Sequence, residues 1–96
     1  MDTILPIEVK DRLDRGEKLT IIDVREDEEV AAGMIPGAKH IALGQLPERH
    51  AEIPKDEEVI LVCRSGGRSS RALGYLESLG YSKLKNMTGG MLEWPQ

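Results

Sequence analysis

The sequence is short of several residue types, and each shortage excludes a class of protein. The 96 residues include one cysteine and no phenylalanine, and only 3% of the chain is aromatic. A single cysteine cannot form an internal disulfide, so the chain is not a disulfide-stapled secreted scaffold. With so few aromatic residues, the core must be built from Leu, Ile, Val, Ala and Met. The length suits one small domain, and we expect residues 1–96 to form it.

Long apolar segments and a cationic excess are also missing. No apolar run approaches the roughly 20 residues of a membrane-spanning helix, and the N-terminus lacks the pattern of a signal peptide. The formal net charge of −4 gives no general attraction to nucleic acid. No His/Cys cluster has metal-ligand spacing, and no glycine-rich nucleotide motif is present. We therefore expect a cytoplasmic monomer with no membrane or nucleic-acid partner, no metal and no cofactor.

Apolar runs and turn residues predict strands that alternate with helices. This alternation is typical of an α/β fold with a mainly parallel sheet. The predicted strands cover 19–24, 39–43, 59–62 and 82–87, with a possible short strand in 1–5, and the predicted helices cover 6–15, 26–32, 46–53 and 69–79, with a helical turn at 91–94.

The only cysteine, Cys63, stands where a predicted strand ends and a glycine-bearing turn opens a helix. Unpaired N–H groups and the helix dipole favour an anion at such a position. Gly66 and Gly67 permit the backbone angles of an anion-binding turn, and Arg64 and Arg68 add positive charge. These features predict a thiol of lowered pKa, and the thiolate is the nucleophile. The alternative is a small buried side chain without a chemical role.

A second group of polar residues follows the preceding predicted strand. Asp23 and Arg25 lie at its carboxyl end, as Cys63 does at the end of its own strand. Ligands bind beyond the carboxyl ends of strands in such sheets. The three residues are therefore expected to face one site.

Three segments together resemble the rhodanese family of sulfurtransferases. The segment 63–69, Cys-Arg-Ser-Gly-Gly-Arg-Ser, resembles the active-site loop of that family. Asp23-Val24-Arg25-Glu26 with residues 33–41 resembles its first signature, and Gly89 to Trp94 resembles its closing one. The segments occur in family order and span nearly the whole chain.

The resemblance implies a rhodanese-like α/β fold, with a mainly parallel central sheet flanked by helices on both faces. It also implies an enzyme of the thiosulfate sulfurtransferase type. Cys63 would take a sulfur atom from a small anionic donor such as thiosulfate and hold it as a persulfide. The sulfur would then pass to a thiol, a protein acceptor or cyanide. Backbone N–H groups of the loop Arg64, Ser65, Gly66, Gly67 and Arg68 would stabilise the persulfide.

The individual side-chain roles stay open at this level. Arg64 attracts an anionic donor or is a surface charge, and Ser65 bonds the sulfur or caps the loop. Arg68 contacts substrate or pairs with Asp23 or another carboxylate to hold the loop. Asp23 and Arg25 are read as loop support before substrate contacts. The two histidines, His40 and His50, are read as structural or surface residues.

Two other functions are compatible with a catalytic cysteine. A sulfur-relay module would carry the persulfide between protein partners with little turnover of small molecules. A phosphatase or arsenate reductase is disfavoured, because four residues separate Cys63 from Arg68. Cysteine phosphatases have five at this place, which gives a loop long enough to surround a phosphate group. The sequence does not name the physiological donor or acceptor.

Overall fold

A single five-stranded sheet runs through the centre of the molecule. The structure is a computed structural model that describes residues 2–95. Every strand pair is parallel, and the strand order is β1-β5-β4-β2-β3. The predicted α/β class with a mainly parallel sheet is confirmed. The strands are β1 (Thr3–Ile4), β2 (Thr20–Asp23), β3 (Lys39–His40), β4 (Val59–Val62) and β5 (Leu84–Met87).

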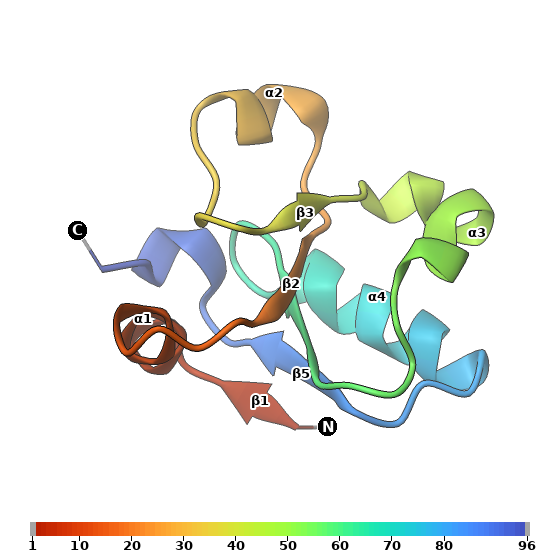
Figure 1. Ribbon diagram of the computed structural model, residues 1–96. Coiled ribbons are helices and arrows are strands. Elements are labelled where there is room, and N and C mark those ends of the chain that lie inside the picture. The colour runs from red at the N-terminus through yellow and green to blue at the C-terminus, as the bar shows by residue number, and fades with distance from the viewer. Residues whose placement is uncertain (1, 96) are drawn as a thin grey trace.

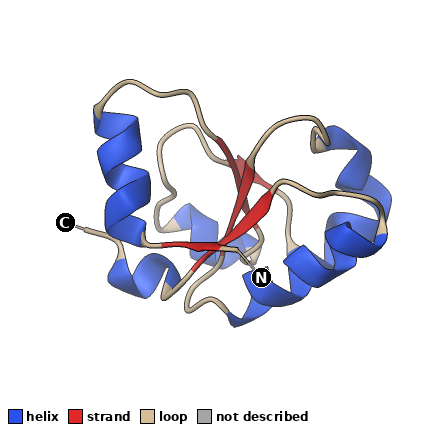
Figure 2. Cartoon of the chain, turned by 90° about the horizontal axis from the view of Figure 1, so that it is seen from below, coloured by secondary structure: helices blue, strands red, loops and turns tan. Residues whose placement is uncertain are grey.

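Helices cover both faces of this sheet (Figures 1 and 2). The helix α1 (Pro6–Asp14) and the 3-10 turn η3 (Gly90–Glu93) pack on one face, and α4 (Gly67–Ser78) packs on the other. None of the helices within residues 2–95 is long and apolar enough to span a bilayer. The remaining helical pieces are α2 (Asp27–Ala31), η1 (Leu43–Gln45), α3 (Leu46–Arg49) and η2 (His50–Glu52).

The alternation of side chains along β4 divides the core into two clusters. Val59 and Leu61 pack on the face of α4, whereas Ile60 and Val62 pack on the face of α1 and η3. Successive side chains of a strand point to opposite faces. Cys63 continues this alternation one residue beyond the strand, so its side chain lies on the α4 face, under the start of that helix.

The elements differ from the sequence-based prediction most clearly in three places. The helix after the cysteine begins at Gly67 rather than at residue 69, because Gly66 already closes the loop and its carbonyl accepts the N–H of Ser70. The predicted helix 46–53 is three short pieces from 43 to 52, and Ile53 is extended because Pro54 follows it. The predicted strand 39–43 is reduced to β3, which pairs with β2 over two residues only.

The sheet register brings two loops together at its carboxyl edge. Asp23 of β2 is the partner of Val62 in β4, and the N–H of Val24 donates to the carbonyl oxygen of Val62 at 2.8 Å. The segments after β2 and β4 therefore leave the sheet side by side. This is where Cys63 lies.

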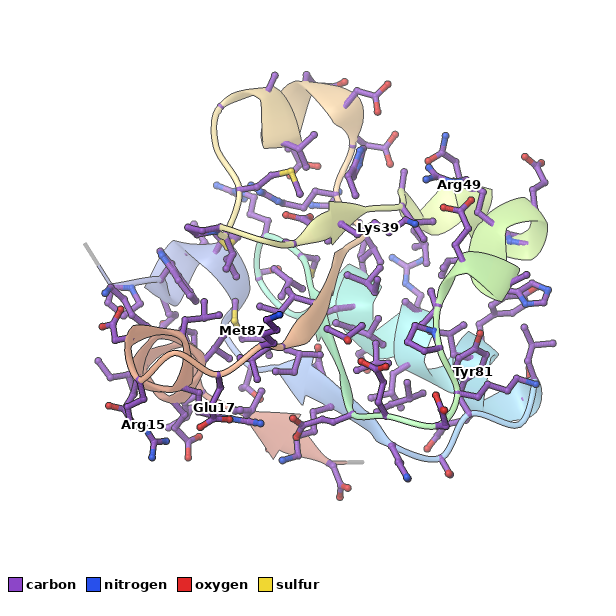
Figure 3. All side chains as sticks on the ribbon, in the orientation of Figure 1. Arg15, Glu17, Lys39, Arg49, Tyr81 and Met87 are labelled. Atoms are coloured by element: carbon purple, nitrogen blue, oxygen red, sulfur yellow. The ribbon has the colours of Figure 1, made fainter. Side chains whose placement is uncertain are left out.

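Tyr81 supports a first prediction about the fold. Its hydroxyl oxygen lies 2.7 Å from the carbonyl oxygens of both His50 and Ile53, which ties the segment between α4 and β5 to η2 and the residue after it (Figure 3). Replacing Tyr81 by Phe removes the one hydroxyl proton that these two carbonyls share, and the contact with Ile53 is buried. We expect Tyr81→Phe to lower the free energy of unfolding by about 1 kcal/mol in urea denaturation. Tyr75→Phe, at a half-buried position beside the same cluster, is the control. Equal midpoints for the Tyr81 variant and the parent would contradict the prediction.

Candidate active site

Cys63 lies at the base of a short loop between β4 and α4. Its side chain is only 1% exposed. The loop closes at Gly66, whose φ of +107° is in the left-handed region that glycine adopts without strain. This turn directs the N–H of Gly66 back to the cysteine, where it donates to Sγ at 2.9 Å. The sulfur thus faces hydrogen-bond donors rather than bulk solvent.

The surroundings of the sulfur favour its ionised form. Burial alone would raise the pKa of the Cys63 thiol, because a thiolate is costly away from water. Hydrogen bonds from the Ser69 hydroxyl and from the backbone N–H groups of Ser69, Gly66 and Ser65 outweigh this effect. The pKa of Cys63 is therefore lowered from its ordinary value. Of the loop N–H groups predicted to face the sulfur, those of Ser65 and Gly66 do so, and the N–H of Ser69 in the first turn of α4 joins them.

Two further residues beside the sulfur were missed in the sequence analysis. Ser69, fully buried in the first turn of α4, has its Oγ 3.3 Å from the Sγ of Cys63. The same Oγ lies 2.5 Å from the Oδ1 of Asn86, a buried residue of β5. A hydroxyl residue directly after the loop, in the first turn of the helix, was a usable sequence signal for Ser69. Asn86 gave none, because only the pairing of β5 with β4 brings it to the site.

The turn η3 contacts the cysteine loop through two backbone hydrogen bonds. The N–H of Met91 donates to the carbonyl oxygen of Cys63 at 2.9 Å, and that of Leu92 donates to Arg64 at 3.0 Å. Gly90 allows this approach, with a φ of +60°. A Cβ on Gly90 would stand 2.4 Å from the carbonyl oxygen of Arg64. The closing segment of the sequence is therefore a clamp on the cysteine loop.

Arg68 holds the loop through a carboxylate that the sequence did not single out. Its Nη1 and Nη2 lie 2.6 and 2.8 Å from the two carboxylate oxygens of Glu29 in α2. The pair is bidentate, a geometry that guanidinium and carboxylate favour. Arg68 lowers the pKa of Glu29 to about 2. The sequence allowed Arg68 to pair with Asp23 or with another carboxylate. The structure shows the second case, because Asp23 is paired with Arg25.

Asp23 and Arg25 pair with each other at the end of β2. Arg25 Nε donates to Asp23 Oδ1 at 3.0 Å, and its Nη2 donates to Asp23 Oδ2 at 2.8 Å. The same Nη2 donates to the carbonyl oxygen of Gly33, and His40 Nε2 lies 2.6 Å from the carbonyl oxygen of Arg25. These contacts organise the segment between β2 and β3, beside the cysteine loop. Within residues 2–95, no three His, Cys, Asp or Glu side chains are grouped to hold a metal ion.

The rim outside the loop combines positive charge with one apolar side chain. Arg64 lies in the loop and Arg71 lies further along α4, outside the loop. Both are exposed, and in the part of the chain that the structure describes neither takes part in an ion pair. The side chain of Leu92, whose backbone contacts Arg64, is 61% exposed. Arg68 does not add to this unpaired positive charge, because its guanidinium is ion-paired with Glu29. The surface outside the cysteine loop therefore carries an exposed cation, Arg64, and an exposed apolar side chain, Leu92.

The clamp gives a prediction for Gly90. Gly90→Ala must move the backbone of residues 63 and 64, because the new methyl group would overlap their carbonyl groups. We expect a loss of about 2 to 3 kcal/mol in the free energy of unfolding and slower alkylation of the thiol. Gly74→Ala is the matched control, because its Cβ meets nothing within 4 Å in the middle of α4. It should be neutral or slightly stabilising. A Gly90 variant as stable as the parent would show that the clamp is not tight.

The Arg68–Glu29 pair gives a prediction for acid stability. The folded-state pKa of Glu29 is about 2, below its ordinary value of 4.5. The pair therefore contributes fully above pH 4.5, and its contribution is lost as the pH falls from there toward 2. Glu29→Gln should lose less stability over this interval, by at most about 1 kcal/mol for a partly exposed pair. Urea denaturation across that interval measures this, with the exposed Glu28→Gln in the same helix as control. Parallel curves for parent and Glu29→Gln would refute it.

Comparison with known proteins agrees with this geometry. The family model described as a rhodanese-like domain matches residues 5–96. The chain is 48% identical to a Bacillus subtilis protein named "Putative sulfurtransferase YtwF", over 90% of this chain and 82% of that protein. It is 42% identical to an Allochromatium vinosum sulfurtransferase, over 86% of this chain and 78% of that one. A rhodanese-like domain protein from Staphylococcus aureus superposes with a TM-score of 0.93 at 38% identity, covering 100% of this chain and 93% of that structure. The chain belongs to the rhodanese-like sulfurtransferase family.

Proposed function

We propose that the protein transfers sulfane sulfur through a persulfide on Cys63, with thiosulfate or a similar small anion as donor. The observation that carries the proposal is the set of donors around one buried sulfur. The Gly66 N–H lies 2.9 Å from Sγ and the Ser69 hydroxyl 3.3 Å from it. Such donors stabilise a thiolate without a neighbouring base. Neither His40 nor His50 is needed to activate the thiol.

The reaction proceeds in two displacements at sulfur. The Cys63 thiolate attacks the outer sulfur of thiosulfate, a new S–S bond forms, and sulfite leaves with the electron pair of the bond that breaks. An acceptor thiolate or cyanide then attacks the outer sulfur of the persulfide and restores the Cys63 thiolate. No external oxidant or reductant is consumed. The thiolate carries its negative charge on Sγ and the persulfide carries it on the outer sulfur, one bond further out. Neighbouring N–H groups of the same loop can therefore serve both steps.

Arg64 is the residue that we assign to donor attraction. Its guanidinium is exposed at the loop that holds the cysteine, without the ion pair that occupies Arg68. A cation there raises the local concentration of a small anion. Because the chain has one free thiol and no possible internal disulfide, we also propose that it works in the reducing cytoplasm. A monomer is the proposed state.

A protein acceptor is the second candidate, and Leu92 favours it. This large apolar side chain is mostly exposed beside the loop. A small anion gains nothing from such a neighbour, whereas a protein surface would cover it. In this alternative the domain is a relay that takes sulfur from one protein and gives it to another, with little turnover of free thiosulfate.

Intact mass spectrometry tests the proposal directly. After incubation with thiosulfate, we expect the mass to rise by one sulfur atom, and a reductant should remove it. Cys63→Ser should show no increase, and because the chain has one cysteine no other thiol can take the label. Arg64→Ala should label more slowly at low thiosulfate concentration, and Arg71→Ala is the charge-matched control.

The choice of donor separates the two candidates. Labelling by a persulfidated donor protein, with none by thiosulfate, would favour the relay. Absence of label with both donors would overturn the persulfide assignment.

A further inference from the structure

The hydroxyl group of Ser69 has more acceptors than it has protons. Its Oγ lies 3.3 Å from Cys63 Sγ, 3.2 Å from the carbonyl oxygen of Gly66 and 2.5 Å from Asn86 Oδ1. A serine hydroxyl can donate only one hydrogen bond. The three neighbours therefore compete for it.

The orientation of the Asn86 amide is fixed by the cysteine loop. Its Nδ2 lies 3.3 Å from the carbonyl oxygen of Gly66, which can only accept a hydrogen bond. Rotating the amide by half a turn would place Oδ1 against that carbonyl oxygen. Oδ1 must therefore face Ser69 and accept from it. The residue is buried, so water does not easily replace this contact.

The protonation state of Cys63 decides which acceptor receives the Ser69 proton. A neutral thiol can donate its own proton to Ser69 Oγ, and Ser69 can then donate to Asn86. A thiolate can only accept a hydrogen bond. If Ser69 donates its proton to the sulfur, it loses its hydrogen bond to Asn86. If it keeps donating to Asn86, a lone pair of its oxygen faces the negative sulfur, which is unfavourable. We propose that Asn86 is a positioning residue that competes with the Cys63 thiolate for the single hydroxyl proton of Ser69.

The competition bears on sulfur transfer and so rests on the proposed function. When a persulfide forms, the negative charge moves from Sγ to the outer sulfur. Ser69 can then return its proton to Asn86, which regains a donor. Asn86 thus weakens the hydrogen bond from Ser69 to the resting thiolate, and it regains the Ser69 proton for itself once the charge has moved outward. A thiolate that is less tightly hydrogen-bonded is the better nucleophile.

Charged groups near the sulfur are the same in every variant of the test. Arg68 of α4 is paired with Glu29 of α2, Arg64 is exposed in the loop, and Asp23 is paired with Arg25 beyond β2. A further set lies on the neighbouring elements: Glu26 before α2, Lys85 of β5 paired with Glu58, and Glu93 of η3 beside Gly89. None of these is altered, so a difference between variants comes from Ser69 and Asn86.

The decisive variant is Asn86→Leu, which keeps the branched shape of the side chain and accepts no hydrogen bond. The rate of alkylation by iodoacetamide as a function of pH gives the midpoint of thiol ionisation, and the single cysteine makes the signal unambiguous. We expect the midpoint to fall by about one pH unit, the effect of one hydrogen bond to a charged group. Below the midpoint, alkylation should be about threefold faster, because the more tightly hydrogen-bonded thiolate is also the weaker nucleophile. In a Ser69→Ala background, Asn86→Leu should leave the midpoint unchanged. No sulfur donor is used, so the result is independent of the persulfide assay.

A structural role for Asn86 predicts the opposite sign. If the amide merely braced Gly66, its loss would loosen the loop and raise the midpoint in both backgrounds. A midpoint that rises or stays fixed in Asn86→Leu, or an equal shift in both backgrounds, would overturn the proposal.

The wild-type protein provides a second measurement if the Leu variant does not fold. The carbon-13 resonance of the Asn86 carboxamide should titrate with the ionisation of Cys63, because the hydrogen bond from Ser69 is lost as the thiolate forms. In Ser69→Ala it should not titrate. A carboxamide signal that is unaffected by Cys63 ionisation in the wild type would equally overturn the proposal.

Discussion

The hydrogen bond from the Gly66 N–H to the Cys63 sulfur is the contact on which the site depends. A charged sulfur that is almost fully buried is stable only if donors replace the water it has lost. That requirement fixes the left-handed turn at Gly66 and starts α4 at Gly67, where free N–H groups meet the sulfur. It also explains how a thiol as buried as a core residue keeps a pKa below its ordinary value.

A loop of this kind holds its geometry only if it is supported from outside. The support comes from elements that are distant along the chain: η3 donates two backbone hydrogen bonds to the carbonyl groups of residues 63 and 64, and Glu29 of α2 binds Arg68 through both oxygens. The carboxyl edge of the parallel sheet makes this possible, because the segments after β2, β4 and β5 all emerge there. A change at Gly90 or Glu29 therefore reaches the sulfur without touching it.

The groups around the sulfur form two layers. Buried polar groups, Ser69 and Asn86 with the loop N–H groups, lie against the sulfur, and the exposed Arg64 and Leu92 lie outside the loop. Both layers contact the loop backbone, Asn86 at the carbonyl oxygen of Gly66 and Leu92 at that of Arg64. In the proposed function, the buried layer sets how readily the sulfur ionises and the exposed layer selects donor and acceptor.

The sequence by itself determined what depends on neighbouring residues. The strand, the glycine turn and the helix start around Cys63 are local features of the sequence. The alternation of strands and helices specified the α/β class, and with it the carboxyl edge of the sheet as the place of the site. Which side chains pair across distant parts of the sequence was decided only by the tertiary structure. Arg68 could have paired with any nearby carboxylate, and the placement of α2 over the loop chose Glu29 rather than Asp23. Asn86 reaches Ser69 across 17 positions of sequence because β5 lies next to β4. No local pattern encodes that adjacency, since it arises from strand order and register.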